Sequence, residues 1–356
     1  MGFSVWLVAG PLLLAGGAGL AAGLIRLLRP TLVRYALARP SARGLHAVPT
    51  PQGGGIAVLA ATVVVAAIGA GLTPLNSGDA VRLAAVLAAA GALATLGFVD
   101  DVRALPALPR LAAQFACMAV GVWMLPEGTR VFGLMPLGLE RALLVLAGAW
   151  FINLTNFMDG MDWITVTELG PISAALAMFW ATGVLPAVPG LLALGLLAGL
   201  GGYAPFNRPP ARLFLGDVGS LPLGFLTAYG LFALAGNPAA GAGALAGAVI
   251  LPLYYIADSG LTLIRRLARR EAVWTPHRTH FYQVAAQRDG VWSVLARIFV
   301  ANAVLMWLGI VAVVAGMAAI GAAALAMAVA VVAFLLLTLG KGRDGAPETP
   351  VDQSRR

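Results

Sequence analysis

The sequence predicts an all-α, polytopic integral membrane protein with about eleven transmembrane helices. Of its 356 residues, 60% are hydrophobic and only 11% are charged, whereas about 25% of the residues of soluble domains are charged. Apolar runs recur along the whole chain, and many approach the ~20 residues that a helix needs to cross a bilayer. These runs do not alternate between apolar and polar positions, as the strands of a transmembrane barrel would.

Charged residues and helix breakers set the expected helix boundaries. The first run carries no Lys or Arg and is followed by Arg26 and Arg29, the reverse of a cleavable signal peptide, so we expect a retained first helix. The second run follows three glycines, the third ends at Asp100, and the ninth ends before the arginines at 265 and 266. The expected helices are 3–25, 54–72, 81–98, 111–125, 141–157, 165–183, 187–203, 219–236, 241–264, 292–313 and 316–340.

The distribution of arginines predicts the orientation in the membrane. Arginine-rich segments between apolar runs are typical of cytoplasmic loops, and the basic tail after residue 340 also indicates the cytoplasmic side. Eleven spans then place the N-terminus outside and the C-terminus in the cytoplasm. We expect one transmembrane catalytic domain over residues 1–340 and a disordered cytoplasmic tail over 341–356. The expected cytoplasmic loops are 26–53, 99–110, 157–164, 204–218 and 265–291.

The charge and the cysteine content argue against a nucleic-acid-binding protein and against a protein held by disulfides or zinc. The net charge of +8 would suggest a nucleic-acid partner in a soluble protein, but membrane topology explains most of these arginines here, so no nucleic-acid partner is expected. The only cysteine, Cys117, lies in an apolar run, which excludes an intramolecular disulfide and gives no zinc signature.

Two adjacent carboxylates end the third apolar run. Ionisable groups inside a helical bundle are costly and usually functional, which makes Asp100 and Asp101 candidates for a divalent metal or for proton transfer. The alternative is a solvated helix end with Arg103 as the local partner of the acids.

The stretch NLTNFMDGMD places four polar groups at the end of the fifth run. Asn153, Asn156 and Asp159 recur every three residues and should lie near one helix face, with Asp162 after the turn at Gly160. Such a face suits a sugar nucleotide, a metal or water. The alternative is a helix C-terminus whose free carbonyls need partners, which accounts for only part of this polar set.

Two further cytoplasmic segments carry candidate residues. In FLGDVGS, Asp217 directly precedes an apolar helix, whose N-terminus would attract phosphate, with Phe214 as a platform for a base; simple capping by Asp217 or Ser220 is the alternative. In TPHRTHFYQ, His277, Arg278 and His280 suit diphosphate recognition, since two histidines without cysteine make a poor zinc site. The GGG at 53–55 is not a phosphate-binding P-loop, because no GK[ST] follows it.

Taken together and in this order, these motifs resemble those of the polyprenyl-phosphate N-acetylhexosamine-1-phosphate transferases of glycosyltransferase family 4. The likeness covers about residues 46–283 through PTPQGGG, the Asp-Asp pair, NLTNFMDGMD, NRPPARLFLGDVGS and HRTHFYQ. It looks nearest to the branch that initiates O-antigen and other surface glycans, whereas the phospho-MurNAc-pentapeptide translocase branch has ten spans and a run of three histidines that this chain lacks.

The resemblance implies a reaction at the cytoplasmic face of the bacterial inner membrane. A UDP-N-acetylhexosamine would donate its sugar phosphate to undecaprenyl phosphate, a membrane lipid, with release of UMP. Mg²⁺, or Mn²⁺ in its place, would neutralise the diphosphate. By resemblance Asp217 would bind this metal, and Asp100 and Asp101 would assist it or deprotonate the lipid phosphate. The catalytic set would be completed by His280, and the substrate-binding set would be Asn153, Asn156, Asp159, Asp162, Asn207, Phe214, Arg278, His277 and His46.

Some positions depart from the family pattern. Many members read DGxDG, whereas Trp163 follows Asp162 here and would either narrow the pocket or pack against the next helix. Gln52 stands where a basic residue or Met is common. The donor sugar stays open among GlcNAc, QuiNAc and FucNAc, as do one-step against two-step transfer and the oligomeric state, for which the translocase branch suggests a homodimer.

Two alternatives belong to other classes of protein. An ion-coupled transporter also carries membrane carboxylates and helices broken by Gly and Pro, but its site should lie near the bilayer midplane, and the acids here lie at cytoplasmic helix ends. A non-catalytic homologue is the second alternative, against which the whole acidic set is present: Asp100, Asp101, Asp159, Asp162 and Asp217.

Overall fold

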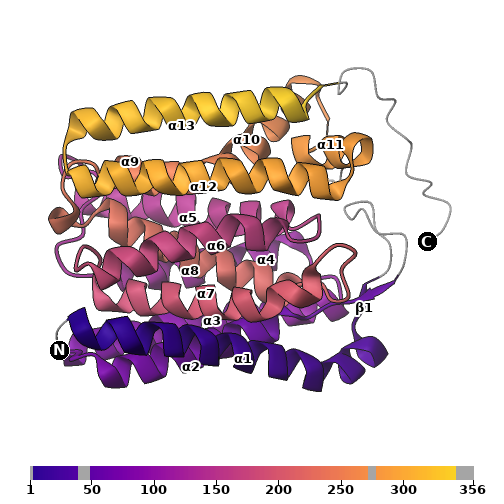
Figure 1. Ribbon diagram of the computed structural model, residues 1–356, viewed down its shortest axis with the longest axis horizontal. Coiled ribbons are helices and arrows are strands. Elements are labelled where there is room, and N and C mark those ends of the chain that lie inside the picture. Colours follow the sequence, from indigo (N-terminus) through magenta and orange to yellow (C-terminus); the bar gives the residue numbers. More distant parts are fainter. Residues whose placement is uncertain (1–2, 39–48, 272–277, 342–356) are drawn as a thin grey trace.

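Long apolar helices run side by side through nearly all of the computed structural model, which describes residues 3–38, 49–271 and 278–341 (Figure 1). Two predicted site residues, His46 and His277, and all of the predicted tail except its first residue lie outside the described residues. The helices are α1 (Phe3–Tyr35), α2 (Gly55–Leu72), α3 (Ser77–Val102), α4 (Ala107–Trp123), α5 (Leu137–Met158), α6 (Ile164–Ala181), α7 (Ala187–Asn207), α8 (Asp217–Ala235), α9 (Ala244–Ile250), α10 (Leu253–Ala268), α11 (Phe281–Asp289), α12 (Val291–Ala315) and α13 (Ala318–Leu339), with a short 3₁₀ helix η1 (Pro238–Ala240). The described strands, β1 (Leu37–Ala38) and β2 (Thr50–Pro51), pair antiparallel.

The all-α, multi-pass membrane architecture is confirmed, while the number of spans differs from the prediction. Among the described residues, nine helices are long and apolar enough to cross a membrane, or ten if the bent pair α9 and α10 is one span. A helix lies at each of the eleven predicted stretches, but α4 has only 17 residues, fewer than the ~20 that a span usually needs.

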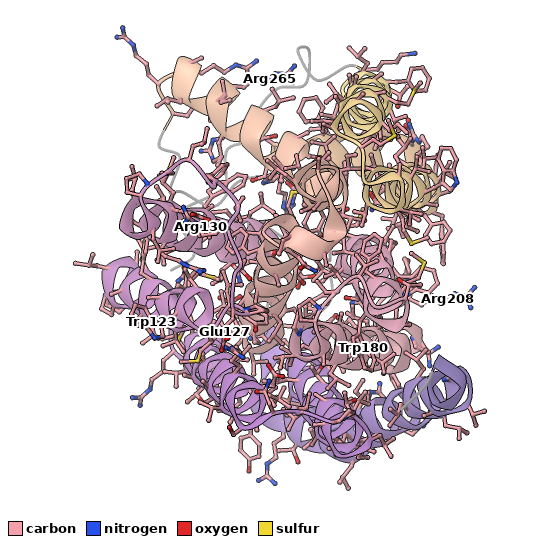
Figure 2. All side chains as sticks on the ribbon, turned by 90° about the vertical axis from the view of Figure 1, so that its left-hand side faces the viewer. Trp123, Glu127, Arg130, Trp180, Arg208 and Arg265 are labelled. Carbon is pink, nitrogen blue, oxygen red and sulfur yellow. The ribbon has the colours of Figure 1, made fainter. Side chains whose placement is uncertain are left out.

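The predicted helix 241–264 is broken in the middle. The structure turns by 62° between α9 and α10, at Leu251 and Pro252. Proline has no N–H to donate and its ring clashes with the preceding turn, which is the usual cause of such a kink. Viewed from the left-hand side of Figure 1, α10 runs across its neighbours toward Arg265 (Figure 2).

Two predicted loops contain helix. The first helix continues ten residues beyond its predicted end, to Tyr35, and so takes up part of the predicted loop 26–53. Arginine is a good helix former, and its long stem can lie along apolar surface while its charge reaches water, so a cluster of arginines does not end a helix. The predicted loop 265–291 holds α11.

The predicted cytoplasmic loops meet at one end of the bundle. In Figure 1 the chain begins α1 at the left, and β1 and α11 lie at the right. Hydrogen bonds there join the end of α3 to the start of α8, and the end of α7 to the segment before α6. The candidate residues therefore gather at one end, as the sorting of loops predicts.

The centre of the bundle is α8, which is the most buried of the long helices and packs chiefly on α3 and α5. Glycines let its first turn come close to two neighbours. A Cβ atom at Gly55 of α2 would lie 2.1 Å from the Cα of Gly219, and one at Gly97 of α3 would lie 2.2 Å from the carbonyl oxygen of Asp217. Neither position has room for a side chain, so these glycines set how the N-terminus of α8 sits against α2 and α3.

Substituting Gly97 with alanine should destabilise the bundle. The added Cβ must push against backbone atoms of Asp217, and such overpacking typically costs about 1–3 kcal/mol. The matched control is Gly91→Ala in the same helix, where nothing lies within 4 Å of the new Cβ. Thermal unfolding in detergent should give a lower midpoint for Gly97→Ala and an equal or higher one for Gly91→Ala. Equal midpoints for both variants would contradict the close approach of α3 and α8.

Candidate active site

The N-terminus of α8 is capped by a carboxylate from another helix. The Asp101 side chain at the end of α3 accepts hydrogen bonds from the backbone N–H of Asp217 (3.0 Å) and of Val218 (3.1 Å). Helix N-termini leave such donors unsatisfied and favour negative charge. Capping by Asp217 or Ser220 is therefore wrong: the residue before the helix is Gly216, with no side-chain cap. Gly216 has a φ of +77°, and a Cβ there would lie 2.6 Å from the Asp101 carboxylate.

Asp100 directly precedes Asp101, and its side chain lies close to that of Asp217. One of its oxygens accepts from the backbone N–H of Leu105 (2.7 Å), and the other pairs with the guanidinium of Arg110 at the start of α4. The same Arg110 nitrogen lies 3.9 Å from the carboxylate of Asp217, and the Asp100 and Asp217 carboxyl groups are within hydrogen-bonding reach of each other. The ion-pair partner of Asp100 is thus Arg110, not Arg103. The sequence did not single out Arg110, although its charge directly before an apolar run was a usable signal.

The amides of α5 divide between two neighbours. Asn156 donates to Asp217 Oδ1 (2.7 Å) and lies 2.9 Å from the Ser220 hydroxyl. Asn153 instead donates to Gln114 Oε1 on α4 (2.5 Å) and to a backbone carbonyl of its own helix. A step of three residues falls 60° short of a full turn in an α-helix, which is enough to direct Asn153 toward α4 and Asn156 toward α8. Only Asn156 therefore contacts the metal candidate Asp217.

Asp159 ends α5 next to the carboxylate cluster. Its Oδ1 accepts from the Thr165 hydroxyl at 2.5 Å. Burial, opposed by the Thr165 hydrogen bond and aided by the nearby charges of Asp217 and Asp162, raises the pKa of Asp159 to about 7. This carboxyl therefore titrates near neutral pH.

Asp162 and Asn207 hold two loops together. Asp162 accepts from the backbone N–H of Ala211 (2.9 Å). Asn207 accepts from the N–H of Trp163 (2.8 Å) and donates to the Leu213 carbonyl (3.0 Å). These bonds hold the segment 208–216, which carries Phe214 to the start of α8, against the segment 159–163.

Phe214 and Trp163 are fixed by backbone contacts. The Phe214 carbonyl accepts from the N–H groups of Gly53 (3.1 Å) and Gly54 (2.9 Å), and its own N–H donates to Pro51 (2.9 Å). Trp163 has a left-handed φ of 60°, its indole N–H donates to the Ala204 carbonyl (2.6 Å), and its ring meets that of Trp292 edge-on at 5.5 Å. The structure thus favours packing against neighbouring helices for Trp163.

His280 is buried and pairs with an aspartate that the sequence analysis missed. Its Nδ1 lies 3.1 Å from Asp258 Oδ1 on α10. The Asp258 carboxylate also accepts from the backbone N–H groups of Phe281 (3.1 Å) and Tyr282 (3.2 Å), which caps α11. A single carboxylate inside the apolar run PLYYIADSGL was the available signal for Asp258. His280 thus helps to hold α11 in place, and Arg278 lies two residues before it.

The paired carboxylates of Asp100 and Asp217 suit a hard divalent cation whose remaining ligands come from the substrate. In the part of the chain that the structure describes, no group of three or more His, Cys, Asp or Glu side chains could hold a metal ion. Mg²⁺, however, is usually bound by one or two carboxylates together with substrate phosphates and water. Asp100 and Asp217 direct oxygens at one cation, the guanidinium of Arg110, so this pair fits such an ion. Both oxygens of Asp101 already accept backbone bonds, which gives Asp101 a positioning role that the sequence did not predict.

Comparisons with known proteins connect this geometry to chemistry. Residues 83–236 match the family model for glycosyl transferase family 4. The chain is 27% identical to a decaprenyl-phosphate N-acetylglucosaminephosphotransferase of Mycolicibacterium smegmatis, over 92% of this chain and 87% of the relative. It is 32% identical to a phospho-N-acetylmuramoyl-pentapeptide-transferase of Symbiobacterium thermophilum, over 61% of this chain and 70% of the relative. It is 24% identical to a probable undecaprenyl-phosphate N-acetylglucosaminyl 1-phosphate transferase of Bacillus subtilis, over 69% of this chain and 68% of the relative.

Removing the Asp101 carboxylate should loosen the first turn of α8. Asp101→Ala leaves two backbone N–H groups unpaired, and loss of a helix cap costs about 1–2 kcal/mol. Hydrogen–deuterium exchange should speed up in peptides that cover residues 216–220. The matched control is Asn76→Ala, which removes the cap at the other end of α3 and should lower the melting temperature without changing exchange in 216–220. Unchanged exchange in Asp101→Ala would contradict the capping role.

The raised pKa of Asp159 predicts a pH dependence of stability. Unfolding returns this carboxyl to a pKa near 4, so between about pH 4 and 7 the folded state holds a proton that the unfolded state has lost. Stability from this group should therefore fall as pH rises through that window and level off above about pH 7. Melting temperatures of the wild type and Asp159→Asn should be compared from pH 5 to 8. The wild type should lose stability relative to the variant between pH 5 and 7, and parallel curves would exclude the shift.

Proposed function

This chain belongs to glycosyl transferase family 4, and from that premise we propose that it transfers N-acetylhexosamine-1-phosphate from a UDP-sugar to a polyprenyl phosphate. The observation that carries the proposal is the pair Asp100 and Asp217. Both carboxylates face the guanidinium of Arg110 at the end of the bundle where the polar loops meet. The names of the relatives support the same reaction class. Undecaprenyl phosphate is the acceptor we propose, and the product would begin an O-antigen or other surface polysaccharide.

In the proposed reaction, an oxygen of the lipid phosphate attacks the β-phosphorus of the UDP-sugar. The bond from that phosphorus to the bridging oxygen breaks, and UMP leaves with the electron pair. Phosphoryl transfer depends mainly on positioning and on neutralising negative charge. Asp100 and Asp217 would hold Mg²⁺, which when bound supplies positive charge at the diphosphate oxygens. Asn156 orients Asp217 through its 2.7 Å bond, and Asp101 holds the turn on which Asp217 sits.

The other predicted residues would form the substrate pocket in this proposal. The Phe214 ring would stack on uracil. Asp162 and Asn207 would shape the nucleotide site by fixing the segment that carries Phe214. Asp159, whose pKa burial raises to about 7, would exchange a proton with the lipid phosphate. Asn153, Arg278, His277, His280 and His46 remain proposed substrate contacts.

The location of the cluster agrees with two substrates of opposite solubility. A nucleotide sugar arrives from water and a polyprenyl phosphate from the bilayer, so a shared site must lie at the boundary between them. The carboxylates lie at the ends of membrane-length helices. We propose that this end faces the cytoplasm in a bacterial inner membrane, where UDP-sugars are made.

Purified protein in detergent should release UMP from a suitable donor. The assay would supply undecaprenyl phosphate, Mg²⁺ and a panel of UDP-GlcNAc, UDP-QuiNAc and UDP-FucNAc, with parallel reactions that lack lipid or contain EDTA. Release that needs the lipid and stops with EDTA would establish the reaction and identify the donor. Release that continues without the lipid would point to hydrolysis instead of transfer.

Asp217→Asn tests the assignment at one residue. Loss of a metal ligand should lower turnover by about 100-fold or more, because metal neutralisation contributes several kcal/mol to the transition state. The matched control is Asp79→Asn, the same change on α3 but about 30 Å along the helix from Asp100. That variant should keep wild-type turnover. A folded Asp217→Asn enzyme with near wild-type turnover would remove Asp217 from the metal site.

A further inference from the structure

In Asp100 and Asp217, one carboxylate oxygen has a neutral hydrogen-bond donor as its partner, and the other faces the charged side chain of Arg110. Asp100 Oδ1 accepts from the Leu105 N–H, and Asp217 Oδ1 accepts from Asn156. Both of these partners belong to the protein framework. The two remaining oxygens, Asp100 Oδ2 and Asp217 Oδ2, face the same nitrogen of Arg110. One guanidinium nitrogen therefore lies beside both carboxylates, paired with Asp100 and 3.9 Å from Asp217.

The enclosed setting favours a cation beside the two carboxylates. The side chains of Asp100, Arg110 and Asp217 are 8%, 20% and 23% exposed, respectively. Two carboxylates held close together repel, and removing one partner from a poorly solvated ion pair is strongly unfavourable. Arg110 thus neutralises the pair when the site holds no other cation, and it keeps both side chains aligned.

The same two oxygens are the ligands that a divalent cation would need. A hard cation prefers carboxylate oxygens, and these oxygens cannot keep a close guanidinium and bind that ion at once. A guanidinium released from the carboxylates would have a good alternative partner in a diphosphate, whose oxygens accept its paired N–H groups in a fork geometry.

We propose that Arg110 is an internal counter-ion that competes with the divalent cation for Asp100 and Asp217 and moves to the diphosphate when the nucleotide binds. This inference rests on the proposed function, because it assumes a metal and a diphosphate at this site. Its consequence is linkage: the cation binds weakly alone and more tightly with the nucleotide, and the nucleotide binds more tightly with the cation by the same factor. Arg110 would then act as a positioning residue in the free enzyme and a substrate contact in the complex.

The test is cation affinity, measured apart from turnover. Mn²⁺ binding to purified full-length protein would be followed by electron paramagnetic resonance, with and without saturating UDP. In the wild type, UDP should strengthen Mn²⁺ binding by about tenfold or more, in the usual range of coupling between sites. In Arg110→Gln, Mn²⁺ alone should bind several-fold more tightly than to the wild type, and the enhancement by UDP should shrink by a similar factor. Arg110→Lys keeps the charge and should give an intermediate result.

The control variant is Arg103→Gln, which removes one positive charge at an exposed position in the turn between α3 and α4. It should bind Mn²⁺ as the wild type does, which separates local competition from a general loss of positive charge. Melting temperatures identify any variant that does not fold, and Arg110→Lys then carries the test. If Arg110→Gln and Arg110→Lys match the wild type in both Mn²⁺ affinity and UDP enhancement, the inference fails while the proposed function stands. If no variant binds Mn²⁺ saturably, with or without UDP, the metal site is refuted and the inference with it.

Discussion

The arrangement of the site depends on one interaction, the Asp101 carboxylate bound to the first two N–H groups of α8. This contact joins the C-terminal end of one long helix to the N-terminal end of the most buried one. It fixes the position of Asp217, and through Asp217 the contacts to Asn156 and Arg110. Since Asp100 precedes Asp101 directly, the same anchor also brings Asp100 close to Asp217 and Arg110. One capping bond pair thus places two candidate metal ligands from helices far apart in the sequence.

Close backbone packing makes that anchor possible. Gly97 and Gly55 leave no space for a Cβ against the first turn of α8, so α2 and α3 approach it at backbone distance. A short aspartate side chain can then span the remaining gap. Hydrogen bonds also hold the segment that leads into α8. The carbonyl of Phe214 accepts from two glycine N–H groups, and Gln52 donates to the backbone carbonyl of Asp101 (3.1 Å). Several weak constraints therefore support one arrangement.

The polar groups at this end of the bundle are of two kinds. Asn207, Asp162 and Asp258 form hydrogen bonds with backbone groups of loops and short helices, and Asp258 also pairs with the His280 side chain. Buried polar groups need such partners if they are not to be left unpaired. The carboxylates of Asp100 and Asp217 instead keep one oxygen each for a charged partner. This difference separates framework residues from the proposed reaction centre within a set of residues that look alike in the sequence.

The sequence by itself determined the class of protein, the helices and the family resemblance. Apolar runs and the distribution of arginines follow from the cost of burying charge in lipid, which acts on each segment separately, so local composition was enough to predict them. The same cost predicted that Asp100, Asp101, Asn156 and Asp217 would gather at one end. Some local signals were misjudged: Pro252 breaks the predicted ninth helix, and arginines continue α1 instead of ending it. The helix α11 was missed because its cap, Asp258, comes from another segment.

Only the tertiary structure decided which partner each polar group has. It assigned the cap of α8 to Asp101, paired Asp100 with Arg110 rather than Arg103, turned Asn153 toward α4, and buried His280 against Asp258. The physical reason is that hydrogen bonds and ion pairs depend on distances of about 3 Å between residues far apart in the chain. Sequence spacing defines such distances only within one helix or turn, so partners across the bundle are decided by how the helices pack.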